Sequence, residues 1–130
     1  DNMEMFVQRY IKLQDEVDMI LIGDIDAVKI NEESKTDVEN FMVENTKIPT
    51  GRWDEHYKND ALITVTTIPK EQGEHTARAA LEILDGKSPR DIPIVRNKKA
   101  KVFLNMKLAK KLGIIFPMDL IESATFTEEN

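Results

Sequence analysis

The chain has 130 residues, a formal net charge of −6 and no cysteine. Its length suggests one domain with a real hydrophobic core, and its apolar content is typical of a folded protein. The acidic balance argues against a nucleic-acid partner, and the lack of cysteine excludes disulfides, thiolate chemistry and cysteine–zinc sites. No apolar run is long enough to span a membrane.

The beginning of the sequence predicts a helix followed by a strand. Residues 2–15 place apolar side chains on one helical face. Because the chain begins inside this helix without an initiating Met, we interpret it as an excised piece of a longer protein. Residues 17–22 form a nearly continuous apolar run, which is typical of a parallel strand covered on both faces. Asp24 and Asp26 follow this strand, at the end where open α/β sheets hold ligands.

The middle of the sequence predicts a second helix and two further strands. Residues 27–46 are polar and favour a helix, with a possible capping box formed by Thr36 and Glu39. Residues 47–51 predict a weak strand, and residues 61–67 predict a strand rich in β-branched side chains. The segment between these two strands is rich in groups that can make specific contacts: Arg52, Trp53, Asp54, Glu55, His56 and Tyr57.

Pro69 begins the strongest predicted helix, which ends near Leu84 and stops at Gly86. Its apolar stripe consists of Ala77, Ala80, Leu81 and Leu84. Two short strands are predicted after it, at residues 94–95 and 101–104. The alternation of helices and strands along the whole chain predicts one α/β domain over residues 1–130, with a mainly parallel sheet flanked by helices.

The C-terminal part carries clear helix boundary signals. Asn105 is a natural N-cap, because its side-chain oxygen can accept from the first-turn amides. Gly113 fits the left-handed position that ends a helix, and Pro117 can open the next helix at its first position. Residues 125–130 predict a frayed tail.

Two groups of residues are candidates for ligand contact. Asp24 could accept a charge-assisted bond from a ligand amine, or it could serve as a helix cap or lie in a solvated turn. Arg52 could bind a carboxylate with its two-pronged guanidinium, and Trp53 could stack on a ring or cover a cation. The alternative for these two is a surface arginine and a tryptophan that anchors its loop on the core.

Other polar residues are better explained without a special function. His56 and His75 lack convergent acidic partners, so we predict no metal site. The acidic pairs lack a nucleophile or a phosphate loop, so we predict solvated faces, no catalytic residues and no cofactor. The basic cluster around residues 98–111 could touch an acidic partner, but a hydrated face explains it better.

Several short motifs occur in a fixed order along the chain. They are Val17-Asp18 leading to Gly23-Asp24, Ile48-Pro49, Gly73 to Ala77, Ile83 to Lys87, Ile92-Pro93, and finally Asn105, Lys107, Ala109, Leu112, Gly113 and Pro117. Taken together, this order resembles the C-terminal half of ABC-transporter solute-binding proteins with the type I periplasmic-binding fold. The resemblance covers nearly all 130 residues.

The resemblance implies the C-terminal lobe of a two-lobed, non-catalytic protein whose first lobe would precede Asp1. Such a protein binds an amino-acid-like or small organic solute between its lobes, outside the cytoplasm and tethered to the membrane. Its partners would be an ABC permease or, in the alternative, the signalling domains of a sensor. On this basis we expect the ligand contacts to include six residues: Asp24, Arg52, Trp53, Asp54, Thr67 and Lys70.

Two segments depart from the family's pattern. The family usually has aromatic residues where this chain has residues 68–70, and residues 51–54 are unusually rich in functional groups. Both departures fall where a ligand would bind, so the resemblance does not identify the ligand. By resemblance, the helix over residues 69–86 would pack in the other lobe, and the chain would cross back from Lys101. The 130-residue chain alone would then expose that helix's apolar stripe, and we expect a homodimer.

Overall fold

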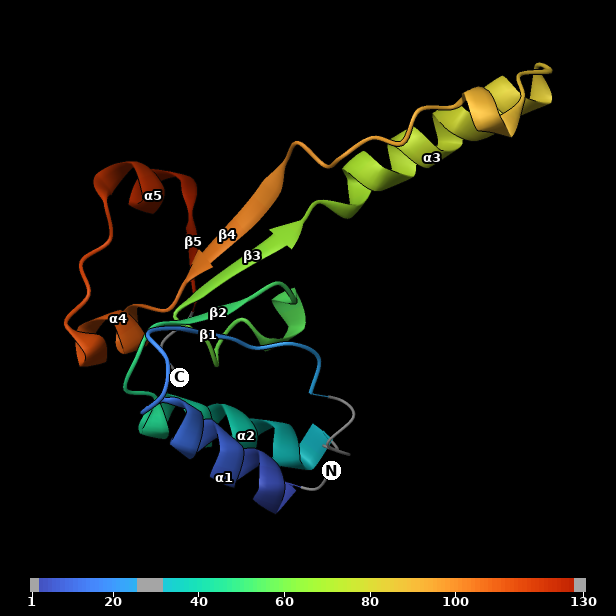
Figure 1. Ribbon diagram of the computed structural model, residues 1–130. Coiled ribbons are helices and arrows are strands. Elements are labelled where there is room, and N and C mark those ends of the chain that lie inside the picture. The colour runs from blue at the N-terminus through green and yellow to red at the C-terminus, as the bar shows by residue number, and fades with distance from the viewer. Residues whose placement is uncertain (1–2, 26–31, 128–130) are drawn as a thin grey trace. The chain divides into compact units, whose positions relative to one another are not determined.

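The computed structural model describes residues 3–25 and 32–127, with the side chains of residues 32–35 left aside. The predicted Asp26 and the predicted helical residues 27–31 lie outside the described residues. In chain order, the elements are α1 (Met3–Leu13), β1 (Ile20–Leu21), α2 (Glu32–Asn45), β2 (Thr50–Arg52), the 3₁₀ turn η2 (Glu55–Tyr57), β3 (Ile63–Thr67), α3 (Pro69–Leu84), the 3₁₀ turn η3 (Pro89–Asp91), β4 (Ala100–Leu104), α4 (Met106–Leu112), α5 (Met118–Ser123) and β5 (Thr125–Phe126) (Figure 1).

Five strands form one sheet in the order β1-β2-β3-β4-β5. β1 pairs with β2, β2 with β3, and β4 with β5, and all three pairs are parallel. Figure 1 shows β3 and β4 running in opposite directions. The mainly parallel sheet with flanking helices that the sequence predicted is therefore confirmed.

The chain divides into two compact units, and one domain over residues 1–130 stays a prediction. Unit 1 consists of Asp1–Thr66 together with Val102–Asn130, and unit 2 is Thr67–Lys101. β3 ends and β4 begins at the boundaries between these units. Each unit is described separately below.

The core of unit 1 has two clusters. The larger consists of Tyr10, Ile20, Ile22, Ile25, Val38, Met42, Tyr57 and Ala61. The smaller consists of Leu62, Leu108 and Ala109, with partly buried side chains from α2, α4 and the segment after α4 packed against it. The predicted amphipathic first helix is confirmed, because Tyr10 of α1 belongs to the larger cluster.

Burial alternates along the first strand. Ile20 and Ile22 are buried, whereas Leu21 between them is 68% exposed. Successive side chains of a strand point to opposite faces, so only one face of β1 is covered by the described residues. The prediction that both faces are covered is wrong for this part of the chain.

The helix signals in the C-terminal part are largely confirmed. The Asn105 side chain accepts from the Leu108 N–H at 3.0 Å and donates to the Asn59 carbonyl at 2.6 Å, which ties the start of α4 to the loop before β3. Gly113 ends α4 with a φ of 66°. Pro117 is the N-cap of α5 and not its first helical residue.

Two other boundary predictions need correction. Thr36 lies inside α2, so it does not cap that helix, which begins at Glu32. The sequence predicted a frayed tail from Thr125, but Thr125 and Phe126 pair in parallel with β4. The Thr127 N–H also donates to the Leu104 carbonyl at 3.1 Å. Residues 128–130 of that tail lie outside the described residues.

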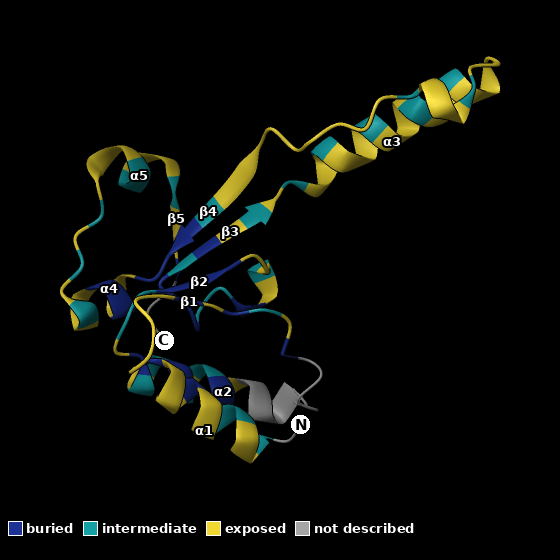
Figure 2. Ribbon diagram, viewed as in Figure 1, coloured by how far each residue is buried: buried dark blue, intermediate teal, exposed yellow. Residues whose placement is uncertain are grey.

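Unit 2 consists of α3 and the chain that returns along it. Pro69 lies in the first turn of α3, and Gly86 follows its end with a φ of 96°, as predicted. α3 has no buried residue, and Leu81 and Leu84 are 62% and 82% exposed, so the predicted exposed apolar stripe is confirmed (Figure 2).

The predicted strand at residues 94–95 does not form. The returning segment of unit 2 is instead bound by the side chain of Glu71. The two carboxylate oxygens of Glu71 accept from the backbone N–H groups of Lys98 and Lys99, each at 3.0 Å. These bonds, the one from Lys98 above all, lower the pKa of Glu71. A carboxylate can thus take the place of a neighbouring strand as the partner of backbone donors.

Candidate functional site

Polar and aromatic groups of unit 1 gather where β1 and β2 end. Because these two strands are parallel neighbours, their carboxyl ends lie at the same edge of the sheet. Asp24 follows β1 and is exposed, and Trp53 follows directly on Arg52, the last residue of β2. The edge is the one at which open α/β sheets hold ligands.

Trp53 and Gly23 lie against each other. A Cβ atom built on Gly23 would lie 3.4 Å and 3.5 Å from Cη2 and Cζ2 of the Trp53 ring, which is ordinary contact distance. Trp53 is nevertheless 57% exposed. The indole therefore presents a solvent-accessible aromatic surface next to Gly23, whose neighbour in the chain is Asp24.

Asp54 organises the turn after Trp53. Its Oδ1 accepts from the His56 N–H at 2.9 Å, which caps the 3₁₀ turn η2. Asp54 is exposed, so it is also accessible from solvent. One observed role of this predicted ligand residue is thus local: it fixes the turn that follows β2.

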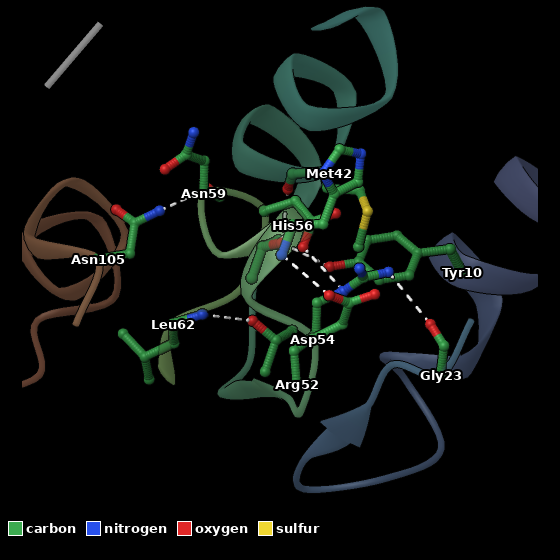
Figure 3. Close-up of polar contacts among 12 residues, drawn as sticks. Tyr10, Gly23, Met42, Arg52, Asp54, His56, Asn59, Leu62 and Asn105 are labelled. Carbon is green, nitrogen blue, oxygen red and sulfur yellow. Dashed lines mark hydrogen bonds and ion pairs between the residues drawn. The ribbon is translucent and has the colours of Figure 1, made fainter. Parts of the chain in front are cut away.

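Arg52 lies inside unit 1, with only 1% of its side chain exposed. Its Nε lies 3.0 Å from Oδ1 of Asp60. Its Nη2 donates to the Gly23 carbonyl at 3.2 Å (Figure 3). Its Cζ lies 4.5 Å from the centre of the Tyr57 ring. The guanidinium of Arg52 thus has three partners inside unit 1. The binding of a ligand carboxylate by its two-pronged guanidinium stays a prediction.

Asp60 is the polar residue that sequence reasoning missed. It is completely buried, and it follows Arg52 by a short loop that contains η2. The pKa of Tyr10 is raised, mainly because its side chain is buried. A hydrogen bond with Thr46 opposes this increase, and the negative charge of Asp60 adds to it. A stretch as polar as residues 54–60 usually lies on the solvent-exposed surface. Only the folded structure shows that Asp60, in this stretch, is buried and paired with Arg52.

Thr67 and Lys70 belong to unit 2. Thr67 is the exposed last residue of β3. Lys70, in the first turn of α3, forms an exposed ion pair with Glu74 at 3.8 Å. Lys70 also borders a cleft of about 690 Å³ between α3 and the returning segment, where basic residues outnumber acidic ones. The structure thus places Asp24, Trp53 and Asp54 after the neighbouring strands β1 and β2 in unit 1, and Thr67 and Lys70 in unit 2.

A second cavity, of about 270 Å³, lies in unit 1 between α1 and β1. Its walls are mainly apolar, and Arg9 and Asp24 are its charged residues. Asp24 therefore borders this cavity. Among the described side chains, those of residues 3–25 and 36–127, no three His, Asp or Glu are grouped to hold a metal ion.

No helix in the described part of the chain is long and apolar enough to cross a membrane.

Three solved structures are similar to this chain. They are a ligand-free, open substrate-binding protein with adhesive properties from Clostridium difficile (22% identity, TM-score 0.69), a conserved domain protein from Vibrio cholerae (22%, 0.61) and an ABC domain in complex with L-Trp from Streptococcus pneumonia (21%, 0.62). The alignments cover 98%, 94% and 95% of this chain, but only 41%, 40% and 42% of those proteins. The chain thus spans about two fifths of their length, and at this identity they establish the fold.

No curated protein matches the sequence. A family model for ABC transporter substrate binding proteins matches residues 4–127, which is nearly the whole chain. The order of the motifs, the mainly parallel sheet and this match agree. The chain belongs to the ABC transporter substrate binding protein family.

Proposed function

We propose that this chain is a non-catalytic ligand-binding domain. It forms one half of a two-lobed cleft that closes on an amino-acid-like or small organic ligand for import by an ABC transporter. Family membership supports ligand binding as the activity. One observation carries the choice of ligand: the exposed Trp53 indole lies on Gly23, and the next residue in the chain is the exposed Asp24. A carboxylate and an aromatic face at the same edge of the sheet suit a ligand with an ammonium group.

The other wall of the cleft comes, in this proposal, from the rest of the full-length protein. Asp24, Trp53 and Asp54 contact the ligand from unit 1, and Thr67 and Lys70 remain predicted contacts. The ligand stabilises the closed form only through its higher affinity for that form. We place the full-length protein outside the cytoplasm, tethered to the membrane, with an ABC permease as its partner.

The proposal predicts that the full-length protein binds L-tryptophan, the amino acid named in one similar structure. Indole-3-propionate, which has the same ring and carboxylate but no amine, should bind at least tenfold more weakly, because Asp24 would lose its charge-assisted partner. Asp24→Asn should weaken tryptophan binding roughly tenfold or more and reduce the difference between the two compounds. Calorimetric titration measures both, after a thermal-shift screen of other amino acids and small amines.

The matched control is Asp119→Asn, which changes an exposed carboxylate in the first turn of α5. This variant should bind as the wild type does. The proposal fails if no amine ligand in the screen stabilises the protein, or if Asp24→Asn binds the best amine as tightly as the wild type.

A sensor or interaction module is the second candidate function, and the exposed stripe of α3 favours it. Ala77, Ala80, Leu81 and Leu84 present an apolar surface that the described residues do not cover. Such a surface promotes self-association. We therefore expect the 130-residue chain to be a dimer in light scattering, and Leu81→Glu to convert it to a monomer. A clean monomer at high concentration would remove this support.

A further inference from the structure

We propose that Arg52 is a positioning residue for the site: from inside unit 1 it fixes the peptide group between Gly23 and Asp24, and it does not touch the ligand. The inference rests on the proposed function for what the site binds. The placement of the peptide group can be tested without any ligand. Because the Arg52 side chain is only 1% exposed, a ligand cannot reach its guanidinium in this arrangement.

The contacts of Arg52 join three separate stretches of unit 1. Arg52 itself ends β2, and its Nη2 donates to Gly23 after β1. Its Nε faces the carboxylate of Asp60 before β3, and Tyr57 of η2 lies under its guanidinium plane. The negative charge of Asp60 and the aromatic face of Tyr57 hold the guanidinium in place. The bond to Gly23 therefore comes from a donor whose position is already fixed.

The bond to Gly23 controls more than one atom. A peptide group is planar, so the Gly23 carbonyl and the Asp24 N–H move as one unit. In a trans peptide the two groups point in opposite directions, and the described chain has no cis peptide bond. Because Arg52 holds the Gly23 carbonyl, the Asp24 N–H points away from the buried Arg52–Asp60 pair. The same bond fixes the position of the Asp24 Cα atom, from which the side chain extends.

Trp53 depends on the same arrangement. It is the residue directly after Arg52, and its ring rests on Gly23 from the exposed side. Gly23 is thus held at its carbonyl by a buried guanidinium, while an exposed indole lies against its Cα. If the carbonyl loses its donor, the peptide group can rotate, and both Asp24 and the surface under the indole will shift.

A lysine at position 52 separates charge pairing from positioning. Its ammonium can still face Asp60, but it lacks the planar fork that reaches Asp60 and the Gly23 carbonyl at once. Arg52→Lys should therefore retain much of the stability that the pair provides and lose the bond to Gly23. Leu108→Ala is the matched control, because Leu108 belongs to the smaller core cluster, whereas Tyr57 belongs to the larger one.

The experiment uses the full-length protein, labelled with ¹⁵N-aspartate and 5-fluorotryptophan, well below the unfolding temperature of every variant. Asp24→Asn and Trp53→Phe assign the Asp24 amide signal and the Trp53 ¹⁹F signal. We expect Arg52→Lys to shift both signals and to weaken binding of L-tryptophan, or of the best amine from the screen, roughly tenfold. Leu108→Ala should leave both signals and the affinity unchanged, although it is less stable.

Three results would overturn the inference. If Arg52→Lys leaves both signals and the affinity at wild-type values, Arg52 positions nothing. If it lowers the affinity while both signals stay in place, Arg52 contacts the ligand directly. If Leu108→Ala shifts the two signals as much as Arg52→Lys does, the effect reflects lost stability. A wild-type protein that binds no amine contradicts the proposed function, while the two signals still decide the role of Arg52.

Discussion

Replacing Asp60 by alanine should lower the free energy of unfolding by about 3–5 kcal/mol, because it leaves the buried Arg52 guanidinium without its counter-charge. The side chains of the pair are 1% and 0% exposed, so water cannot replace the lost carboxylate. Tyr57 would still lie against the guanidinium, but an aromatic face compensates only part of a full charge. Urea unfolding followed by far-ultraviolet circular dichroism measures the loss.

The double variant Arg52→Met, Asp60→Leu is the control for this prediction. It removes both charges and fills a similar volume, so it should be clearly more stable than Asp60→Ala. Exposed ion pairs contribute at most about 1 kcal/mol. A loss smaller than this for Asp60→Ala would therefore contradict a buried Arg52–Asp60 pair from which water is excluded. So would a double variant that is less stable than the single one.

Leu108→Ala should cost about 2–5 kcal/mol, which is the range for removing a fully buried leucine side chain. Leu108 is 0% exposed and joins α4 to Leu62 and Ala109 in the smaller core cluster. The same urea unfolding experiment measures the loss.

Leu84→Ala in α3 is the matched control, because Leu84 is 82% exposed. In the 130-residue chain made monomeric by Leu81→Glu, this change should alter stability by no more than about 0.5 kcal/mol. Equal losses for the two variants would contradict the burial described for unit 1 or the exposure described for α3. A loss for Leu84→Ala only in the full-length protein would show that the rest of that protein covers α3.

Local sequence signals predicted the helix boundaries well, because the interactions that set them lie within a few residues. Asn105 caps a helix whose first amides follow it directly, and Gly113 adopts the left-handed conformation that ends the same helix. The parallel sheet also followed from the alternation of elements. The ends of α4 depend on chain geometry that neighbouring residues decide.

The site was harder to predict, because burial of a charged residue depends on groups that only the fold brings near. Arg52 looked like a ligand-binding residue because it follows a strand at the expected edge. Its actual neighbours come from the end of β1, from η2 and from the loop before β3. No local pattern marks Asp60 as the member of a polar loop that turns inward.

Two predictions about strands were wrong for the same reason. Ile94 and Val95 have high β-propensity, yet they form no strand, and the nearby backbone donors of Lys98 and Lys99 bind the Glu71 carboxylate. Thr125 and Phe126 looked like a tail, yet β4 offers them a pairing edge. Strand formation depends on an available partner as much as on the residues themselves.

Unit 1 is built from two segments that are separated in the sequence, so its core cannot be completed until the second segment has been synthesised. Leu62 emerges from the ribosome long before Leu108 and Ala109, with all of unit 2 between them. At translation rates of about 5–20 residues per second, the half-built sheet waits for seconds with an open edge at β3. During this interval the nascent chain can pair with a second chain or bind a chaperone. The arrival of β4 and α4 ends that exposure and completes the core.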